Sequence, residues 1–312
     1  MSEKSELVSI VITTHNRGDR LEYAVKSATN QTYRHTEVIV VDDNSDNLVE
    51  REKTEAIINK YPNVRLVKNT KNLGGAISRN EGIKAARGKM ISFLDDDDQY
   101  LPSRIEKLYK IIKLHENDNI GLAYCSCDAI NENSDIVNEY VNVANGKPFY
   151  EHMMNCVAGT SMWLAPKKVL ENIGGFDDVP SKQDSTVILK MMDAGYNIYG
   201  TEEKLVLFLE HSGERISGLK ISNIEGIKKY REKCRNSYGR LLKKQISMVE
   251  CNFSNSLITV YLANGDVSNA KRELANIRRY KPISKMYFKN AIKILFRKKY
   301  AAMVSARRRQ NG

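Results

Sequence analysis

The chain has 312 residues, of which 41% are hydrophobic and 28% are charged, and its formal net charge at pH 7 is +11. This length allows a sizeable buried core and predicts one large globular domain, alone or with an appendage. No stretch approaches the roughly 18 consecutive apolar residues of a membrane span, and the N-terminal sequence MSEKSELVS lacks the basic and apolar regions of a signal peptide. We therefore expect a cytoplasmic protein. Its five cysteines follow no metal-ligand spacing, which predicts reduced, mostly buried thiols.

Basic residues are concentrated in the last third of the chain. Residues 213–312 contain 24 Lys or Arg against 6 Asp or Glu, whereas residues 1–212 have a net charge of −7, from 25 basic and 32 acidic residues. This division indicates an acidic N-terminal part that could use a metal ion. It also indicates a basic C-terminal part that binds an anionic surface, either lipid headgroups or nucleic acid.

The first part of the chain has the pattern of a β-α-β unit. Residues 7–14 form an apolar run typical of a buried strand, residues 20–30 have helical periodicity with Asp19 as a plausible N-cap, and residues 37–41 form a second strand. The right-handed crossover makes the two strands parallel, so the polar residues 13–17 and 42–45 emerge at the same edge of the sheet. Their side chains, Thr13, Asn16 and Arg17 among them, are suited to hydrogen-bonding a base and a ribose.

The pattern continues with two more strands. Residues 50–61 read as a helix, 64–68 as a strand, 72–75 as a turn into a helix over 76–86, and 90–94 as a buried strand. Four strands thus bring four polar loops to one edge of a Rossmann-like, mostly parallel α/β sheet. Open parallel sheets bind ligands at that edge.

The fourth of these loops is the acidic run 95–98. Four adjacent carboxylates need a cation or a solvated position, and Mg²⁺ or Mn²⁺ is often shared between one or two carboxylates and substrate phosphates. The run therefore favours a site for a nucleotide diphosphate. Asp95 and Asp97 would point to the same side if the chain were extended there. The alternative is a solvated acidic loop.

Two common nucleotide-binding fingerprints do not occur. No G-x-G-x-x-G follows the first strand, and the chain contains no G-x-x-x-x-G-K-[ST] phosphate loop. A dehydrogenase and a P-loop enzyme are therefore not expected, although a parallel sheet alone would allow either.

Four linked motifs instead resemble those of family 2 glycosyltransferases. They are VSIVITTHNR at 8–17, VVDDNS at 40–45, NLGGA at 72–76 with SRNEG at 78–82, and FLDDDD at 93–98. The resemblance in order and spacing extends over residues 7 to about 215. It implies the GT-A fold and an inverting transfer of a sugar from a nucleotide donor.

The resemblance also implies roles for the residues of these motifs. Thr13 matches the position near the uracil, and Asp43 matches the carboxylate that holds the base or ribose. Asp95 and Asp97 match the outer residues of the DxD motif, with Asp97 as the direct ligand of Mn²⁺ or Mg²⁺ and Asp96 nearer the ribose. The turn at Asn72 and the side chain of Arg79 match positions that line the nucleotide pocket, although Arg79 could equally be a charge on a helix surface.

Asp184 is the candidate general base. It lies in the first turn of a helix expected over 187–194, where an aspartate is also a common N-cap. An inverting transfer needs a carboxylate that takes the proton from the acceptor hydroxyl. The family usually has Glu-Asp at this point, and this chain has Gln183-Asp184, so the departure leaves the base itself in place.

Three further features of the middle of the chain resemble family elements, and two of them have an alternative reading. His211 begins a segment, 211–217, that resembles a loop closing over the diphosphate, and it is either a metal or phosphate ligand or a structural histidine. Trp163 lies in a segment that resembles the floor of the sugar pocket, and it is either part of that floor or a core aromatic. The turn 174–177 (GGFD) matches a family element whose role is local packing.

The C-terminal region reads as helical from about residue 224, with breaks at 265–266 and 281–282. Within 284–304, Phe288, Ala291, Ile292 and Leu295 form an apolar stripe, and lysines step by four along another face. Such a helix could lie on an anionic membrane surface, or its stripe could pack on the catalytic domain. No nucleic acid is expected as a partner, because the region has no recognised module.

These patterns predict a catalytic domain over 1–217, with a nucleotide-sugar half at about 1–98 and an acceptor half at about 99–217, and a helical basic region over 218–312. The function they favour is transfer of a hexose or N-acetylhexosamine from a UDP-sugar to a hydroxyl of a glycan or lipid-linked glycan in cell-surface polysaccharide synthesis. The enzyme would be peripheral on the inner face of the plasma membrane. The alternatives are a nucleotidyltransferase and a non-catalytic protein that binds nucleotide sugars or membrane.

Overall fold

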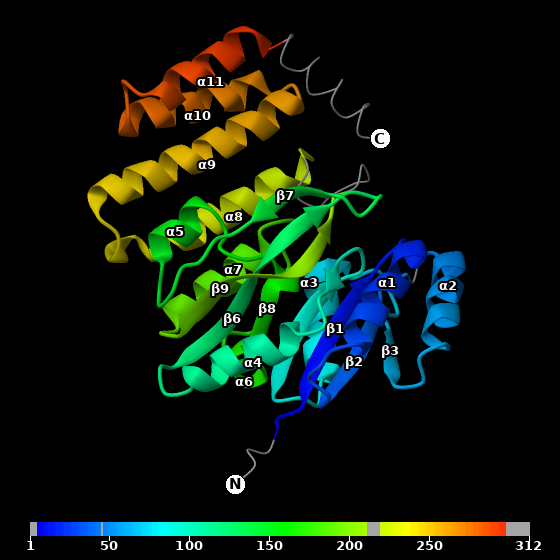
Figure 1. Ribbon diagram of the computed structural model, residues 1–312. Helices are drawn as coiled ribbons and strands as arrows, with labels where there is room; N and C mark the ends of the chain where they lie inside the picture. Colours follow the sequence, from blue (N-terminus) through cyan, green and yellow to red (C-terminus); the bar gives the residue numbers. More distant parts are fainter. Residues whose placement is uncertain (1–4, 45, 211–218, 298–312) are drawn as a thin grey trace. The chain divides into compact units, whose positions relative to one another are not determined.

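The computed structural model describes residues 5–44, 46–210 and 219–297 (Figure 1). The chain divides into two compact units, one with residues 1–148, 157–178 and 187–210 and the other with residues 149–156, 179–186 and 211–312. The division does not follow a single cut in the sequence, because two short central segments belong with the C-terminal helices.

The first unit is built around a mixed sheet. In the described part of the chain this sheet has nine strands in the order β3-β2-β1-β4-β8-β6-β9-β5, with β7 paired to β6. Its first half is parallel, as predicted, and consists of β1 (Val8–Thr14), β2 (Thr36–Asp42), β3 (Val64–Lys68) and β4 (Met90–Asp95). The strands β1, β2 and β4 are mostly apolar and buried because helices cover both faces of the sheet, whereas the edge strand β3 is only partly buried.

Three helices connect the parallel strands, namely α1 (Gly18–Thr29), α2 (Leu48–Ile58) and α3 (Gly74–Ala85). The first two crossovers step outward along the sheet, and the third returns from β3 at the edge to β4 beside β1. Because each crossover is right-handed, this reversal places α3 on the face opposite α1 and α2. The reversal between β1 and β4 is the point at which open sheets bind ligands.

The predicted N-cap of the first helix is wrong. The helix α1 begins two residues earlier than predicted, at Gly18, and Arg17 takes the N-cap position without a capping side chain. The carboxylate of Glu50 accepts a hydrogen bond from the Gly18 amide at 2.9 Å and so supplies an acceptor at this end of the helix.

The second half of the sheet is mostly antiparallel. Its strands are β5 (Gln99–Tyr100), β6 (Ile120–Ile130), β7 (Ile136–Tyr140), β8 (Trp163–Pro166) and β9 (Asn197–Leu209), of which only β6 and β9 are parallel to each other. The helices α4 (Arg104–Leu114), α6 (Lys167–Asn172) and most of α7 (Gln183–Asp193) accompany them, with a 3₁₀ turn, η1, at Thr160–Met162. All five residues of β7 are exposed, so this strand has no alternation of buried and exposed residues that would mark it in the sequence.

An aromatic cluster fills the core next to β4. The rings of Trp163 and Phe176 are stacked with centroids 6.0 Å apart, and Phe93 meets both edge-on. Trp163 is fully buried, so its reading as a core aromatic is confirmed. The GGFD turn supplies Phe176 to this cluster, and both of its glycines have left-handed φ angles, at 74° and 62°.

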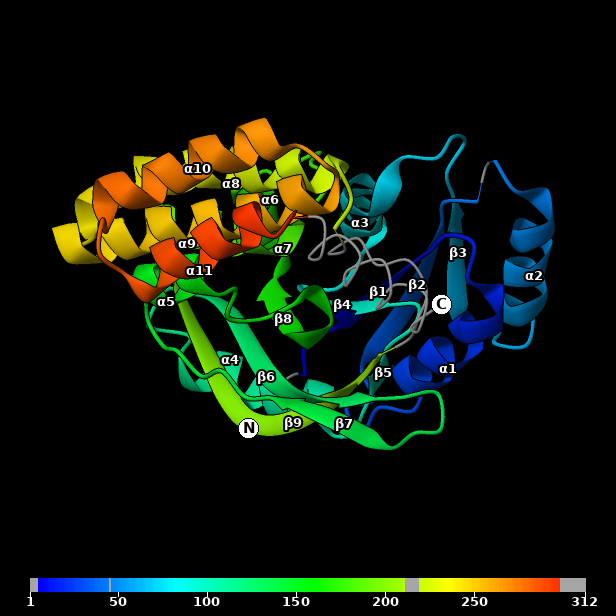
Figure 2. The same ribbon diagram turned by 90° about the horizontal axis from the view of Figure 1, so that it is seen from above.

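The second unit is helical. It contains α5 (Phe149–Met154), the first turn of α7, α8 (Ser222–Asn236), the 3₁₀ turn η2 (Tyr238–Arg240), α9 (Lys243–Ala263), α10 (Val267–Tyr280) and α11 (Lys285–Leu295). The long helix α9 is its centre and packs against α5, α8, α10 and α11 (Figure 2). The predicted breaks fall between α9 and α10 and between α10 and α11, as expected.

The apolar stripe of the last described helix is not packed. On α11, Asn290 and Ile294 are buried, whereas Phe288, Ile292 and Leu295 are 53%, 56% and 70% exposed. These three side chains of the predicted stripe are therefore not packed within the helical unit. None of the helices in the described ranges is both long and apolar enough to cross a membrane.

Candidate active site

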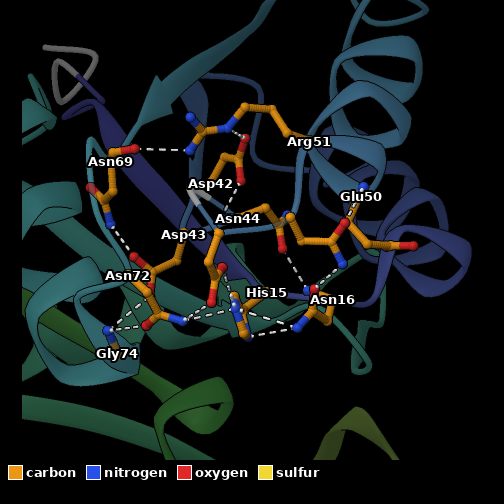
Figure 3. Close-up of polar contacts among 12 residues, drawn as sticks. His15, Asn16, Asp42, Asp43, Asn44, Glu50, Arg51, Asn69, Asn72 and Gly74 are labelled. Carbon is orange, nitrogen blue, oxygen red and sulfur yellow. Dashed lines mark hydrogen bonds and ion pairs between the residues drawn. The ribbon is translucent and has the colours of Figure 1, made fainter.

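The carboxylate of Asp43, directly after β2, holds the turn that follows β3 (Figure 3). Its side chain is buried, and Oδ1 accepts hydrogen bonds from Nδ2 of Asn69 at 2.7 Å and from the amide of Leu73 at 2.8 Å. Its Oδ2 accepts one from the amide of Gly74, also at 2.8 Å. Asp43 therefore fixes the turn that leads into α3, where Gly74 has a left-handed φ of 75°.

Three polar side chains meet above this turn. Nε2 of His15 lies 2.9 Å from Nδ2 of Asn72 and 3.2 Å from Oδ1 of Asp46, and Asn72 also donates to Oδ2 of Asp46 at 3.2 Å. These contacts come from the ends of β1, β2 and β3, which agrees with the prediction that their loops share one edge. His15 and Asp46 were not among the predicted site residues, because neither has a ligand spacing in the sequence.

The loop after β1 is tied to the loop after β2. The amide of Asn16 donates to Oδ1 of Asn44 at 2.6 Å, and Asn47 donates to Oδ1 of Asn16 at 2.8 Å. Asn16 has a left-handed φ of 56°, a conformation that asparagine adopts more readily than most residues. Thr13, at the end of β1, lies between Val41 and Asp95 in the register of the sheet.

The acidic run is a turn and not an extended strand. The strand β4 ends at Asp95, and the amide of Asp98 donates to the carbonyl of Asp95 at 3.0 Å, which closes a turn over Asp96 and Asp97. The chain is therefore not extended here, which was the condition for Asp95 and Asp97 to point to the same side. The solvated-loop alternative is also wrong, because Asp96 and Asp98 are only 4% and 1% exposed.

Two arginines neutralise three of the four carboxylates. Nη1 of Arg17 lies 3.1 Å from Oδ1 of Asp96 and 2.6 Å from Oδ2 of Asp97, and Nη2 of Arg79 lies 2.6 Å from Oδ1 of Asp95. Burial raises the pKa of Asp96 to about 7, although the charge of Arg17 opposes the rise. Arg79 is buried, so the reading of this residue as a helix-surface charge is wrong.

The fourth carboxylate has neutral partners. Oγ of Ser161 donates to Oδ2 of Asp98 at 2.6 Å, and the amide of Leu209 donates to Oδ1 at 3.3 Å. Burial, together with the charges of Asp95 and Asp97, raises the pKa of Asp98 well above its usual range. Ser161 was not predicted as a site residue, because its small, apolar surroundings in the sequence carry no polar pattern.

Asp184 belongs to the second unit, whereas the carboxylates described above belong to the first. Its Oδ1 accepts from the amide of Ser185 at 2.7 Å, and Sγ of Cys156 lies 3.7 Å from Oδ2. The next residue in the helix is anchored by His152, whose Nε2 lies 2.8 Å from the carbonyl oxygen of Ser185. Burial lowers the pKa of His152 to about 4. His211 lies outside the described residues.

The acidic turn fits a divalent metal through two carboxylates. Oxygen ligands suit Mg²⁺ and Mn²⁺, which typically take one or two carboxylates together with substrate phosphates and water. The described residues contain no group of three or more His, Cys, Asp or Glu side chains able to hold a metal by themselves. A metal at Asp95 and Asp97 would therefore need phosphate oxygens from a bound nucleotide.

The sequence profile of "Glycosyl transferase family 2" matches residues 9–163, about half of the chain, and thus covers the whole parallel half of the sheet and both arginines. This chain belongs to glycosyl transferase family 2. The predicted family and the enzyme class are thereby confirmed, and the membership argues against the nucleotidyltransferase alternative.

Two relatives illustrate the similarity within the family. An uncharacterized glycosyltransferase of Haemophilus influenzae is 29% identical over 210 residues, which are 66% of this chain and 69% of the relative. The Escherichia coli UDP-Glc:alpha-D-GlcNAc-diphosphoundecaprenol beta-1,3-glucosyltransferase WfaP is 40% identical over 121 residues, 38% of this chain and 45% of the relative. The similarity to WfaP and to several other relatives thus spans less than half of their length.

Solved structures share the fold over most of the chain. S. aureus TarS 1-349, in complex with UDP-GlcNAc, has a TM-score of 0.59 at 15% identity and covers 97% of this chain and 91% of its own. The mannosyltransferase PcManGT from Pyrobaculum calidifontis, in complex with GDP-Man and Mn²⁺, has a TM-score of 0.59 at 20% identity. The match covers 94% of this chain and 88% of PcManGT. The predicted GT-A fold is confirmed.

Proposed function

We propose that this glycosyltransferase transfers a hexose or N-acetylhexosamine from a UDP-sugar to a hydroxyl of a glycan acceptor, with inversion and with a divalent metal. The observation that carries the proposal is the placement of Asp43, Asn72 and the acidic turn at one edge of the parallel sheet, with Arg17 and Arg79 against the carboxylates. Carboxylates and guanidinium groups in one place suit a metal-bound diphosphate, because each has an opposite charge to pair with.

In the donor complex, Asp95 and Asp97 would hold the Mn²⁺ or Mg²⁺ ion, and His211 would complete its shell. The metal would supply a Lewis acid that neutralises the charge of the departing diphosphate. Arg17 and Arg79 now pair with these carboxylates. Their guanidinium groups suit the phosphate oxygens when the metal takes over the carboxylates, since an arginine binds phosphate as readily as carboxylate.

The nucleoside would occupy the edge formed by the first three strands. Thr13 and the Asn72 turn would contact the uracil and ribose, with Asn16 beside them and Asp96 toward the ribose. Asp43 would hold the base or ribose. It would also fix the Asn72 turn, which it already holds through three hydrogen bonds. A buried carboxylate with this many donors is rigid, which favours a defined nucleoside position.

Asp184 would act as the general base. Its Oδ1 is engaged by the Ser185 amide, which orients the carboxylate at the start of α7. An inverting transfer proceeds in one displacement: the acceptor oxygen forms its bond to the anomeric carbon, the bond to the diphosphate breaks, and the base takes the hydroxyl proton. With an α-linked donor the product is β-linked.

The acceptor would be a glycan of a cell-surface polysaccharide, in lipid-linked form. The relative WfaP is named for a UDP-Glc donor and a diphosphoundecaprenol-linked acceptor, which supports this choice. The exposed stripe of α11 and a C-terminal region, 274–312, with 12 basic and no acidic residues support a peripheral position on an anionic inner membrane surface.

Calorimetric titration of a panel of UDP-sugars and GDP-mannose, first with Mn²⁺ and then with EDTA, tests the proposal. We expect one UDP-sugar to bind in the presence of the metal and to lose most of its affinity in EDTA. If the protein bound GDP-mannose more tightly than any UDP-sugar, GDP-mannose would be the donor instead of a UDP-sugar. If no nucleotide sugar bound under either condition, the non-catalytic alternative would take its place.

A further inference from the structure

A groove runs between two helices of the second unit. Both α8 and α10 pack on the central helix α9, and the space between them has a volume of about 650 Å³. Ion pairing closes its floor, because Nη1 of Arg231 on α8 lies 3.0 Å from Oε2 of Glu273 on α10. The groove lies entirely within one unit, so its shape depends only on how these three helices pack.

The walls of the groove are mainly basic. Lys228 and Arg235 on α8 and Arg272 and Arg279 on α10 line it together with Arg231, against only two acidic residues. Lys228 and Arg235 are seven residues apart on α8, and Arg272 and Arg279 are seven residues apart on α10. Each pair therefore lies on one face of its helix, two turns apart. Lys228, Arg272 and Arg279 form no ion pair with any residue of the described ranges.

Behind the groove residues Arg231 and Arg235 lies a buried ionic network centred on Glu250. Glu250 on α9 has no exposed surface, and its Oε1 accepts from Nε of Arg235 at 2.7 Å and from the Tyr238 hydroxyl at 2.9 Å. Arg231 pairs with its other oxygen, Nε to Oε2, at 2.9 Å. Burial would raise the pKa of Glu250, but hydrogen bonds from Arg235 and Arg231 hold this pKa at about 2. This network is therefore rigid and nearly neutral. Of the remaining groove cations, Lys228 lies over the ring of Tyr261, with 5.8 Å from Nζ to the ring centroid, and Arg272 and Arg279 are exposed.

This arrangement is not explained by the stability of the fold. Like charges facing each other across a groove repel, and an acidic residue at one of these positions would relieve the repulsion. The centre of the α10 wall is instead Ala275, a small residue that leaves the space between Arg272 and Arg279 open. Guanidinium groups bind phosphate oxygens in a bidentate manner, and several around one pocket match a group with more than one negative charge.

We propose that the groove between α8 and α10 is a binding site for a phosphate-bearing ligand, with a diphosphate group as the best match to Lys228, Arg272 and Arg279. The proposal does not depend on the proposed transferase reaction, since none of these residues belongs to the candidate active site. The volume of the groove exceeds that of a diphosphate alone, so the ligand would carry further atoms beyond the phosphate group.

The test is calorimetric titration of the full-length protein with inorganic pyrophosphate in EDTA, which removes metal-dependent binding at the acidic turn. The variant Arg272→Ser/Arg279→Ser removes two exposed groove cations. The control Lys271→Ser/Arg278→Ser removes the same charge from adjacent, exposed positions of α10 that do not line the groove. We expect the groove variant to lose about tenfold or more in affinity and the control to change by about twofold at most.

A second arm identifies the source of the phosphate group. Co-sedimentation with phosphatidylcholine vesicles that contain phosphatidic acid tests a lipid headgroup, whereas pyrophosphate tests a soluble ligand. If Arg272→Ser/Arg279→Ser loses binding and the control variant does not, the groove is the binding site. Loss of pyrophosphate binding then indicates a soluble ligand, and loss of vesicle binding indicates a lipid headgroup. Equal behaviour of the two variants in both arms, or no binding by the unaltered protein, overturns the proposal. Equal thermal midpoints and unchanged UDP-sugar binding with Mn²⁺ keep this result separate from misfolding and from the active site.

Discussion

Arg79 on α3 and Asp95 at the end of β4 form an ion pair with 2.6 Å between Nη2 and Oδ1, and the arginine side chain is only 8% exposed. The guanidinium group also lies over the ring of Phe176, with 5.7 Å from Cζ to the ring centroid. A buried arginine on a helix next to the sheet would be costly without such partners, and here the partner is a predicted metal ligand. A metal bound as proposed would therefore compete with Arg79 for the same carboxylate.

Replacement of Arg79 should make stability depend on metal. We expect Arg79→Met to lower the free energy of unfolding by about 2 kcal/mol, because it leaves Asp95 without its charge partner. Added Mn²⁺ with UDP should restore more stability to this variant than to the unaltered protein. Thermal unfolding with and without Mn²⁺ and UDP measures both effects. Arg79→Lys, which keeps the charge, serves as the control, and an identical metal response of all three proteins would contradict the competition.

Asp184→Asn should abolish transfer without loss of donor binding. The amide can still accept the hydrogen bond from Ser185 but cannot take a proton, so kcat should fall by about 10²-fold to 10⁴-fold. Calorimetry should give the same affinity for the UDP-sugar. Asp193→Asn, at the other end of α7, is the matched control. Unaltered turnover in Asp184→Asn would remove this residue as the base.

Asp43→Asn should weaken both the fold and the nucleotide site. The carboxylate accepts three hydrogen bonds, and an amide at this position turns one acceptor into a donor that faces other donors. We expect a loss of about 2 kcal/mol in the free energy of unfolding, the typical cost of disrupting a charged buried hydrogen bond. Urea titration measures it, with the exposed Asp46→Asn as the control. Lost UDP binding at full stability would instead mean that Asp43 acts only by contact with the nucleoside.

His152 should make stability depend on pH. Its folded-state pKa of about 4 lies below the 6.5 of an ordinary histidine because the ring is buried. Between pH 6.5 and 4 the unfolded chain therefore binds more protons than the folded one, and stability falls as the pH is lowered through this window. The contribution amounts to roughly 3 kcal/mol. Urea unfolding at several pH values should give a shallower slope for His152→Gln. Equal slopes in both proteins would mean that His152 does not resist protonation.

Removal of the exposed apolar side chains of α11 should reduce membrane binding. We expect Phe288→Ser/Ile292→Ser/Leu295→Ser to lose most of its co-sedimentation with vesicles of phosphatidylglycerol, since burial of each side chain is worth about 1.5–3 kcal/mol. The control Leu48→Ser/Val49→Ser/Leu114→Ser removes three exposed apolar side chains from the first unit. Equal sedimentation of the two variants would refute the assignment of this surface.

The sequence predicted the parallel half of the fold well, and the reason is physical. A parallel strand covered on both faces is apolar along its whole length, so β1, β2 and β4 stand out as uninterrupted runs that end in polar loops. Strand β7 was missed because it is exposed on both faces, and β8 because it has only four residues. The edge at which Thr13, Asp43 and Asp95 emerge followed from the right-handed crossover alone.

The partners of the site residues were decided only by the tertiary structure. Arg17 meets Asp96 and Asp97 across about 80 residues of sequence, and Arg79 reaches Asp95 only because α3 returns across the sheet from β3. The same holds for the turn held by Asp43 and for the basic groove between α8 and α10. Strand and helix periodicity depends on neighbours within a few residues, whereas such pairings depend on the angles and distances at which whole elements pack.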